Sequence, residues 1–276
     1  MASAIPNKRV QWTWKANIDP FSESEPAEWK PYSDVENRII EEAYQARQNH
    51  AILDTYSINF KQKIQILNSD SSKQRPIRRE EANRANQHLR EERFTFTPIN
   101  PEQPFAGLYG WISPFIRGAV KELNITKDQL PSKDETVVPL IVEKAAIGII
   151  EEGKKIGKRR EAEQIAKELR EKKHSGMKEV WKCCANLYSM ESFLYKKLNE
   201  NMRLIGSKEH EQEWRNNIPT LGPFCLLLWD NPFENKTTPR GTIFYRGAKL
   251  SDQLISIFKE DCSKKEKPRR KKRIIY

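Results

Sequence analysis

The spacing of aromatic and apolar residues between positions 10 and 79 constrains the fold of this chain most strongly. Trp12 and Trp14 alternate with polar residues, which is the period of a strand with one buried face. Apolar residues then recur at helical spacing, namely Ile39, Ile40, Ala43 and Tyr44. Strand-like positions follow at Ile52, Leu53, Tyr56 to Phe60, Ile64, Ile66 and Ile77. This pattern predicts one helix packed on a small curved antiparallel sheet.

The same segment resembles the WWE domain, a small module that binds poly(ADP-ribose). The resemblance rests on the order of five motifs: Val10-Gln-Trp-Thr-Trp14, Trp29-Lys-Pro-Tyr-Ser33, Ile39-Ile-Glu-Glu-Ala-Tyr44, Tyr56-Ser-Ile-Asn-Phe60 and Gln74-Arg-Pro-Ile-Arg-Arg79. The two tryptophans and the glutamate that give the family its letters correspond to Trp12, Trp29 and Glu41. We expect Trp12, Trp29 and Tyr44 to lie in the core, because large aromatic side chains dominate the cores of small domains.

The resemblance also implies a ligand site. In WWE domains a tyrosine, a glutamine and an arginine hold iso-ADP-ribose, and their spacing corresponds here to Tyr56, Gln65 and Arg75. The chemistry of these residues fits the ligand, because an aromatic ring stacks on adenine, an amide binds ribose hydroxyls and a guanidinium binds phosphates. Arg78 and Arg79 are further candidates for phosphate contacts. This site requires no cofactor and no metal.

Length and composition favour an intracellular protein of two domains. The chain has 276 residues, of which 37% are apolar and 32% are charged. No apolar run is long enough to span a membrane, and the first residues lack the apolar core of a signal peptide. The cysteines show no metal-ligand spacing and suit a reducing compartment; they are Cys183, Cys184, Cys225 and Cys262. We therefore expect a cytoplasmic or nuclear location and no membrane partner.

The positive charge is concentrated at one end of the sequence. The formal net charge is +11, and residues 264–276 hold eight basic residues and one acidic residue, which is +7 of that total. The rest of the chain is close to neutral, so we expect no sequence-specific binding of nucleic acid. Residues 264–276 form a predicted basic disordered tail, in which 264–273 have the composition of a nuclear import signal or of a solvated end.

A charged and proline-rich linker is predicted at 81–104, where a helix candidate from Glu80 to Arg93 precedes three closely spaced prolines. Beyond it the apolar residues recur at helical spacing, in Val137 to Ile150, in Ala162 to Leu169 and in Met177 to Ile205. These segments predict a helical subdomain. We interpret the charged segment from Glu151 to Lys173 as its solvent-exposed face.

A second resemblance begins near Tyr188. The stretch Tyr188-Ser-Met-Glu-Ser-Phe-Leu-Tyr-Lys-Lys-Leu-Asn199, followed by Leu221 to Asp230 and by Gly241-Thr-Ile-Phe-Tyr-Arg-Gly-Ala248, is similar to the amino-terminal half of an arginine-specific mono-ADP-ribosyltransferase of the R-S-E class. The resemblance implies that Arg246 would bind the phosphate and ribose of NAD, a role that suits a planar and permanently charged guanidinium. NAD would then be a substrate.

The rest of that family's pattern does not follow Arg246. The sequence after Gly247 contains neither the Ser-x-Ser strand nor the Glu-x-Glu loop, whose carboxylate stabilises the transition state. Loss of one such group commonly costs about a hundred- to a thousandfold in rate. We therefore interpret the chain as a truncated isoform, a decayed copy or a gene model that leaves its reading frame after Ser263.

The predicted fold class is α+β, with a small WWE-type half-barrel sheet and one helix, then a largely helical region leading into an incomplete ADP-ribosyltransferase α/β fold. The expected domains are a WWE domain at 8–80, the linker at 81–104, a partial transferase-like region at 105–263 and the basic tail at 264–276. The leading function is binding of poly(ADP-ribose) or of ADP-ribosylated proteins. The alternatives are NAD-dependent transfer of ADP-ribose to protein arginine, with no complete catalytic set in this chain, and an interaction unrelated to ADP-ribose.

Overall fold

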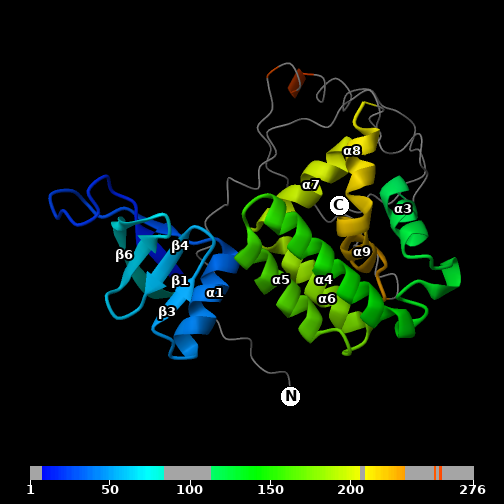
Figure 1. Cartoon of the computed structure of the whole chain (residues 1–276), viewed down its shortest axis with the longest axis horizontal. Coiled ribbons are helices and arrows are strands. Elements are labelled where there is room, and N and C mark those ends of the chain that lie inside the picture. The colour runs from blue at the N-terminus through cyan, green and yellow to red at the C-terminus, as the bar shows by residue number, and fades with distance from the viewer. Residues whose placement is uncertain (1–7, 84–112, 206–208, 234–251, 253–254, 257–276) are drawn as a thin grey trace.

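The computed structural model describes residues 8–83, 113–205, 209–233, 252 and 255–256. Figure 1 shows a small sheet with one helix lying beside a larger group of helices. The sheet and α1 come from the N-terminal part of the chain, and the helical domain follows it in the sequence. The expected order, an antiparallel sheet with one helix and then a largely helical region, is confirmed.

The sheet has six antiparallel strands in the order β2-β1-β6-β5-β4-β3. Their bounds are β1 (Lys8–Lys15), β2 (Trp29–Pro31), β3 (His50–Ile52), β4 (Tyr56–Asn59), β5 (Ile64–Leu67) and β6 (Asp70–Asn83). The long strand β6 pairs with β5 through its first half and with β1 through its second half, so it joins the two halves of the sheet. A helix was expected to begin at Glu80. This prediction is wrong for residues 80–83, because they belong to β6 and pair with β1.

Helix α1 (Asp34–Gln45) covers the sheet. Its first turn is fixed by a capping box, in which the Ser33 hydroxyl accepts from the Glu36 backbone N–H and the Glu36 carboxylate accepts from the Ser33 N–H. Ile40 and Ala43 on α1 pack against apolar residues of the sheet. The buried core of this domain consists of Trp12, Tyr32, Ile40, Ala43, Ala51, Leu53, Ile58 and Ile77.

The helical domain consists of α3 (Pro114–Glu122), α4 (Val138–Lys155), α5 (Arg159–Glu171), α6 (Met177–Ser189), α7 (Phe193–Leu204), α8 (Glu211–Asn216) and α9 (Ile218–Trp229), with short 3₁₀ turns η2 (Lys127–Gln129) and η3 (Glu135–Val137). Helix α9 is its centre, since every residue from Thr220 to Leu227 is buried. It lies against α3, α4 and α6. None of the described helices is both long and apolar enough to cross a membrane.

The two domains are joined by an interface formed by α1, in which Val35 is buried in the core of the helical domain and polar side chains contact α5. Arg38 forms an ion pair with Glu168, and Glu42 accepts hydrogen bonds from Gln164 at 2.8 Å and from Lys167 at 2.7 Å. The expectation that 151–173 is a solvent-exposed face is therefore wrong for this side of α5, because α1 covers it. The sequence pattern could not show the polar part of this contact, since charged pairs between domains leave no periodic apolar signal.

The transferase resemblance receives no structural test. All regular elements within the described residues between 113 and 233 are helices. Arg246 and the Tyr-Arg-Gly motif lie outside the described residues, as do most of the predicted linker and all of the predicted basic tail.

Candidate functional site

Strand register places the three candidate ligand residues on one face of the sheet. Gln65 on β5 is the Cα partner of Ile58 on β4 and of Arg75 on β6. Paired residues in an antiparallel sheet project to the same side, and so do residues two apart in one strand. Tyr56 lies two residues before Ile58, so Tyr56, Gln65 and Arg75 share a face. That face is the one covered by α1, because Ile58 is buried with Ile40.

Gln65 is a buried polar residue with a fixed orientation. It is 2% exposed, and its Oε1 accepts a hydrogen bond of 2.7 Å from the Tyr32 hydroxyl. Burial, with smaller effects from Glu36 and Tyr56, raises the pKa of Tyr32 far above its usual range, so the phenol stays protonated and donates. The amide oxygen thus faces Tyr32, and the amide nitrogen is the remaining donor of this side chain.

Arg75 is held in place before any ligand binds. Its Nη1 donates to the backbone carbonyls of Lys15 at 3.0 Å and of Asn17 at 2.7 Å. Its guanidinium also lies 5.6 Å from the centre of the Trp14 ring. One guanidinium nitrogen is therefore occupied by the end of β1 and the loop after it. Such a pre-oriented fork suits bidentate binding of an anion.

Glu41 has a structural position beside the core. Its carboxylate accepts hydrogen bonds from Trp12 Nε1 at 2.8 Å, from Arg79 Nε at 3.0 Å and from Arg79 Nη2 at 2.7 Å. Burial alone would raise the pKa of Glu41, but hydrogen bonds from Arg79, Gln45 and Trp12 lower it overall. Arg79 is thus committed to a carboxylate, which leaves it poorly placed to bind phosphate.

Arg78 belongs to the other face of the sheet. It lies an odd number of residues from Arg75 in the same strand, and successive side chains alternate between faces. Its guanidinium is 4.4 Å from the centre of the Trp29 ring, and it forms an ion pair of 2.8 Å with Glu80. Trp29 is thus half-buried beneath Arg78, whereas Trp12 is fully buried. Tyr44 is 44% exposed and packs edge-on against Trp12 and Phe60. The expectation of a core position is therefore confirmed for Trp12 and wrong for Trp29 and Tyr44.

Sequence reasoning did not assign Tyr32 to the site. Its position in the Trp29-Lys-Pro-Tyr motif gave one signal, and the need of a buried glutamine for a hydrogen-bond partner gave another. The partner comes from the segment just after β2, distant in sequence from β5. Only the folded sheet brings these two side chains together.

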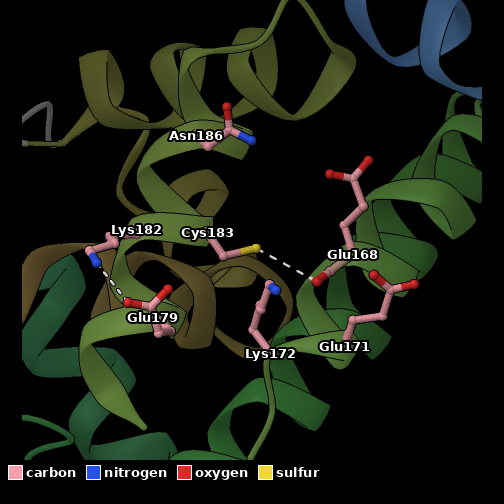
Figure 2. Close-up of a pocket in the computed structure, with 7 residues that line it drawn as sticks. All are labelled: Glu168, Glu171, Lys172, Glu179, Lys182, Cys183 and Asn186. Atoms are coloured by element: carbon pink, nitrogen blue, oxygen red, sulfur yellow. Dashed lines mark hydrogen bonds and ion pairs between the residues drawn. The ribbon is translucent and has the colours of Figure 1, made fainter. Parts of the chain in front are cut away.

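A shallow groove in the helical domain lies between α5 and α6 (Figure 2). It has a volume of about 230 Å³ and mixed charge, and it is lined by Glu168, Glu171, Lys172, Glu179, Lys182, Cys183 and Asn186. The Cys183 thiol lies 3.7 Å from the Glu168 carbonyl oxygen, to which it donates. Burial, and then the Glu168 carboxylate, raises the pKa of Cys183 to about 11. This thiol is protonated at neutral pH and is a poor nucleophile.

The other described cysteines are inert thiols. Cys184 and Cys225 are buried, and burial raises the pKa of Cys225 to about 12 and that of Cys184 well above its usual value. In the part of the chain that the structure describes, no three His, Cys, Asp or Glu side chains come together as a metal site. Cys262 lies outside the described residues.

The sheet domain is a small α+β module that brings Tyr32, Tyr56, Gln65 and Arg75 together on one side of its sheet. Residues 10–79 match the family model of the WWE domain. The chain thus contains a WWE domain, and the match covers about a quarter of its 276 residues. No curated protein matches the chain.

Proposed function

We propose that the WWE domain of this chain binds the iso-ADP-ribose unit of poly(ADP-ribose), free or attached to proteins. The observation that supports this most strongly is the convergence of Tyr56, Gln65 and Arg75 on one face, with Gln65 oriented by Tyr32. An aromatic ring, an amide donor and a guanidinium match the adenine, ribose and phosphate of this ligand. No cofactor is needed for this function.

Each residue has a distinct role in the proposal. The half-buried ring of Tyr56 stacks on the adenine, and the Gln65 amide nitrogen donates to a ribose hydroxyl. Arg75 binds phosphate through the donors that the carbonyls of Lys15 and Asn17 leave available. Since those carbonyls already orient the guanidinium, little side-chain entropy remains to be lost on binding.

Calorimetric titration of the whole chain with iso-ADP-ribose tests the proposal, with ADP-ribose and NAD as parallel ligands. The Arg75→Ala variant should weaken iso-ADP-ribose binding by about ten- to a hundredfold, the usual cost of losing hydrogen bonds to a charged group. Arg78→Ala is the matched control, because it removes an arginine from the opposite face of the same strand. Equal affinity of wild type and Arg75→Ala would refute the assignment of Arg75.

Arg75→Ala also removes two hydrogen bonds to backbone carbonyls, so its thermal unfolding is measured alongside. Gln65→Leu gives a second test, because it keeps the volume of a buried side chain while removing the donor. Weak binding by both variants, with an intact fold, supports the shared face as the site. Normal binding by both would place the ligand elsewhere.

The transferase resemblance supplies a separate proposal on sequence alone, namely binding of NAD by Arg246 and transfer of ADP-ribose to protein arginine. No structural observation favours it. Loss of NAD binding in Arg246→Ala, with iso-ADP-ribose binding unchanged, would support it.

The import function of residues 264–273 is likewise a proposal, tested by the location of a fluorescent fusion with and without this segment.

A further inference from the structure

The helical domain contacts both chain segments that position the tyrosines of the candidate site. Asp34, two residues after Tyr32, accepts a hydrogen bond of 2.8 Å from the Glu191 backbone N–H. Asp54, two residues before Tyr56, accepts hydrogen bonds from the backbone N–H groups of Arg160 at 2.6 Å and Glu161 at 3.1 Å. A part of the helical domain is therefore held next to the ligand face of the WWE domain.

The part held at Asp54 is the turn between α4 and α5, which we call the basic turn, residues 154–160. Its sequence is Lys154-Lys-Ile-Gly-Lys-Arg-Arg160, with five cationic residues and no acidic one. Two residues of chain span at most about 7 Å, so the Asp54 backbone lies within that distance of Tyr56. The basic turn is thus a close neighbour of the stacking tyrosine.

Two carboxylates beside the basic turn are buried, whereas the two arginines of the turn are exposed. The flanking carboxylates of Glu152 and Glu161 are only 2% and 3% exposed, and they accept hydrogen bonds from the Thr220 hydroxyl and the Phe193 backbone N–H. The side chains of Arg159 and Arg160 are 66% and 53% exposed, and both lie near the single carboxylate of Glu163. Lys155 and Lys158 pair with the two buried carboxylates, Glu152 and Glu161. The exposed cations are thus Lys154, Arg159 and Arg160, beside the carboxylates of Glu151 and Glu163, which leaves an excess of one positive charge on this surface.

We propose that the basic turn is a second anion-binding surface, which contacts the phosphates of an ADP-ribose unit next to the one held by the WWE domain. The inference rests on the proposed function and extends it, because it makes the site selective for a polymer over a single unit. The binding groups are side chains, since the first backbone N–H groups of α5 are already occupied by Asp54. Arginine suits this role because its planar fork binds phosphate bidentately.

A polymer bound at the WWE site has further phosphates in the units on either side of the bound one. Each phosphate neutralised by a cationic side chain releases counterions, so the affinity acquires a dependence on salt. In the proposed orientation the phosphates of a single unit lie at Arg75 on β6, two strands from Tyr56 on β4, so the basic turn contacts the phosphates of a neighbouring unit. The two ligands should therefore differ both in affinity and in salt dependence.

The test compares iso-ADP-ribose with a defined oligomer of ADP-ribose, using the full chain. The triple variant Lys154→Gln, Arg159→Gln and Arg160→Gln should bind iso-ADP-ribose as the wild type does and should lose about tenfold or more in oligomer affinity. Its slope of log affinity against log salt should be shallower by about 0.7 for each lost phosphate contact. The control removes the same charge from exposed lysines of the helical domain, Lys121, Lys127 and Lys178.

The possible results separate the two proposals. Unchanged oligomer affinity in the triple variant, with iso-ADP-ribose still bound, would refute phosphate binding by the basic turn. It would leave the proposed WWE ligand site intact. No binding of either ligand by the wild type would overturn both. Equal competition by single-stranded RNA would show a general polyanion surface and contradict the assignment to ADP-ribose polymer. Should the triple variant unfold, the single exposed variant Lys154→Glu gives the same comparison.

Discussion

Arg79 binds Glu41 through two parallel hydrogen bonds, from Nε to Oε2 at 3.0 Å and from Nη2 to Oε1 at 2.7 Å. The same carboxylate accepts from the indole of the buried Trp12. One glutamate thus joins α1 to β1 and β6, which are separate in sequence. The tryptophan and the glutamate of the WWE pattern meet here in the structure as a tie between the helix and the sheet.

Removal of this carboxylate should destabilise the WWE domain while leaving Tyr56, Gln65 and Arg75 unchanged. We expect Glu41→Ala to cost about 2–3 kcal/mol, because it leaves the Arg79 guanidinium and the Trp12 N–H without their acceptor. Amide hydrogen exchange of β1 and β6 in the whole chain measures the loss locally. Lys61→Ala, at an exposed position between β4 and β5, is the control for the sheet. Unchanged exchange in Glu41→Ala would contradict the prediction.

The contribution of Glu41 should depend on pH in a defined direction. The pKa of Glu41 is lowered below its usual 4.5 in the folded protein, so the unfolded state binds a proton more readily. The stabilisation is therefore complete above about pH 4.5 and is lost as the pH falls through the folded pKa. Comparison of wild type with Glu41→Gln isolates this group. The stability difference should shrink on acidification, and a difference that grew instead would refute it.

Tyr32 should act on the ligand through Gln65. In Tyr32→Phe the ring is kept, but the buried amide oxygen of Gln65 loses its donor and the amide can rotate. We expect iso-ADP-ribose affinity to fall by about five- to tenfold, the effect of one neutral hydrogen bond. Gln65→Glu provides the diagnostic partner, because a carboxylate lacks the donor whether or not Tyr32 is present. If Tyr32→Phe weakened binding equally in the Gln65→Glu background, Tyr32 would act independently of Gln65.

The sequence predicted the local features of the WWE domain well, because they depend on periodicity. The alternation around Trp12 gave β1, and the spacing from Ile39 to Tyr44 gave α1. The spacing of Tyr56, Gln65 and Arg75 came from family resemblance, and their common face follows from strand register, which the sequence did not specify. The Tyr32–Gln65 hydrogen bond was missed for the same reason.

Contacts between domains were beyond sequence reasoning. The polar side of α5 has the composition of a solvated surface, yet Gln164 is buried against Glu42 of α1. The pattern that marks a surface charge also marks a polar interface, because both consist of charged residues at helical spacing. Asp54 is a clear example, since a lone acidic residue in a turn gives no sign that it caps a helix of another domain.

The interface pair Arg38 and Glu168 should contribute a measurable coupling energy. Burial raises the pKa of Glu168 overall, although Arg38 and Gln164 act in the opposite direction. Because burial disfavours the charged carboxylate, the ion pair with Arg38 is needed to stabilise it. A double-mutant cycle of Arg38→Ala and Glu168→Ala should give about 1 kcal/mol. The exposed pair Arg159–Glu163 is the control, for which a smaller coupling is expected because solvent screens it. Thermal unfolding of the whole chain reports both cycles, and equal couplings would show that the interface pair is no different from a surface pair.

The packing of α4 on α9 gives a prediction in which two physical effects oppose each other. Gly148 lies in the middle of α4, where alanine would normally favour the helix by up to about 1 kcal/mol. A Cβ atom at this position would lie 1.9 Å from the backbone carbonyl oxygen of Thr220 on α9. Since that neighbour is backbone in a fully buried helix, it cannot move without separating the two helices.

Overpacking should therefore exceed helix propensity. We expect Gly148→Ala to destabilise the helical domain by about 3 kcal/mol, the upper part of the range for a forced shift in a packed core. Lys144→Ala, on the exposed side of the same helix, should change the stability by less than about 0.5 kcal/mol. Urea unfolding followed by exchange of the α4 and α9 amides measures both variants. A stabilised Gly148→Ala would mean that α4 and α9 are not in the close contact that the structure shows.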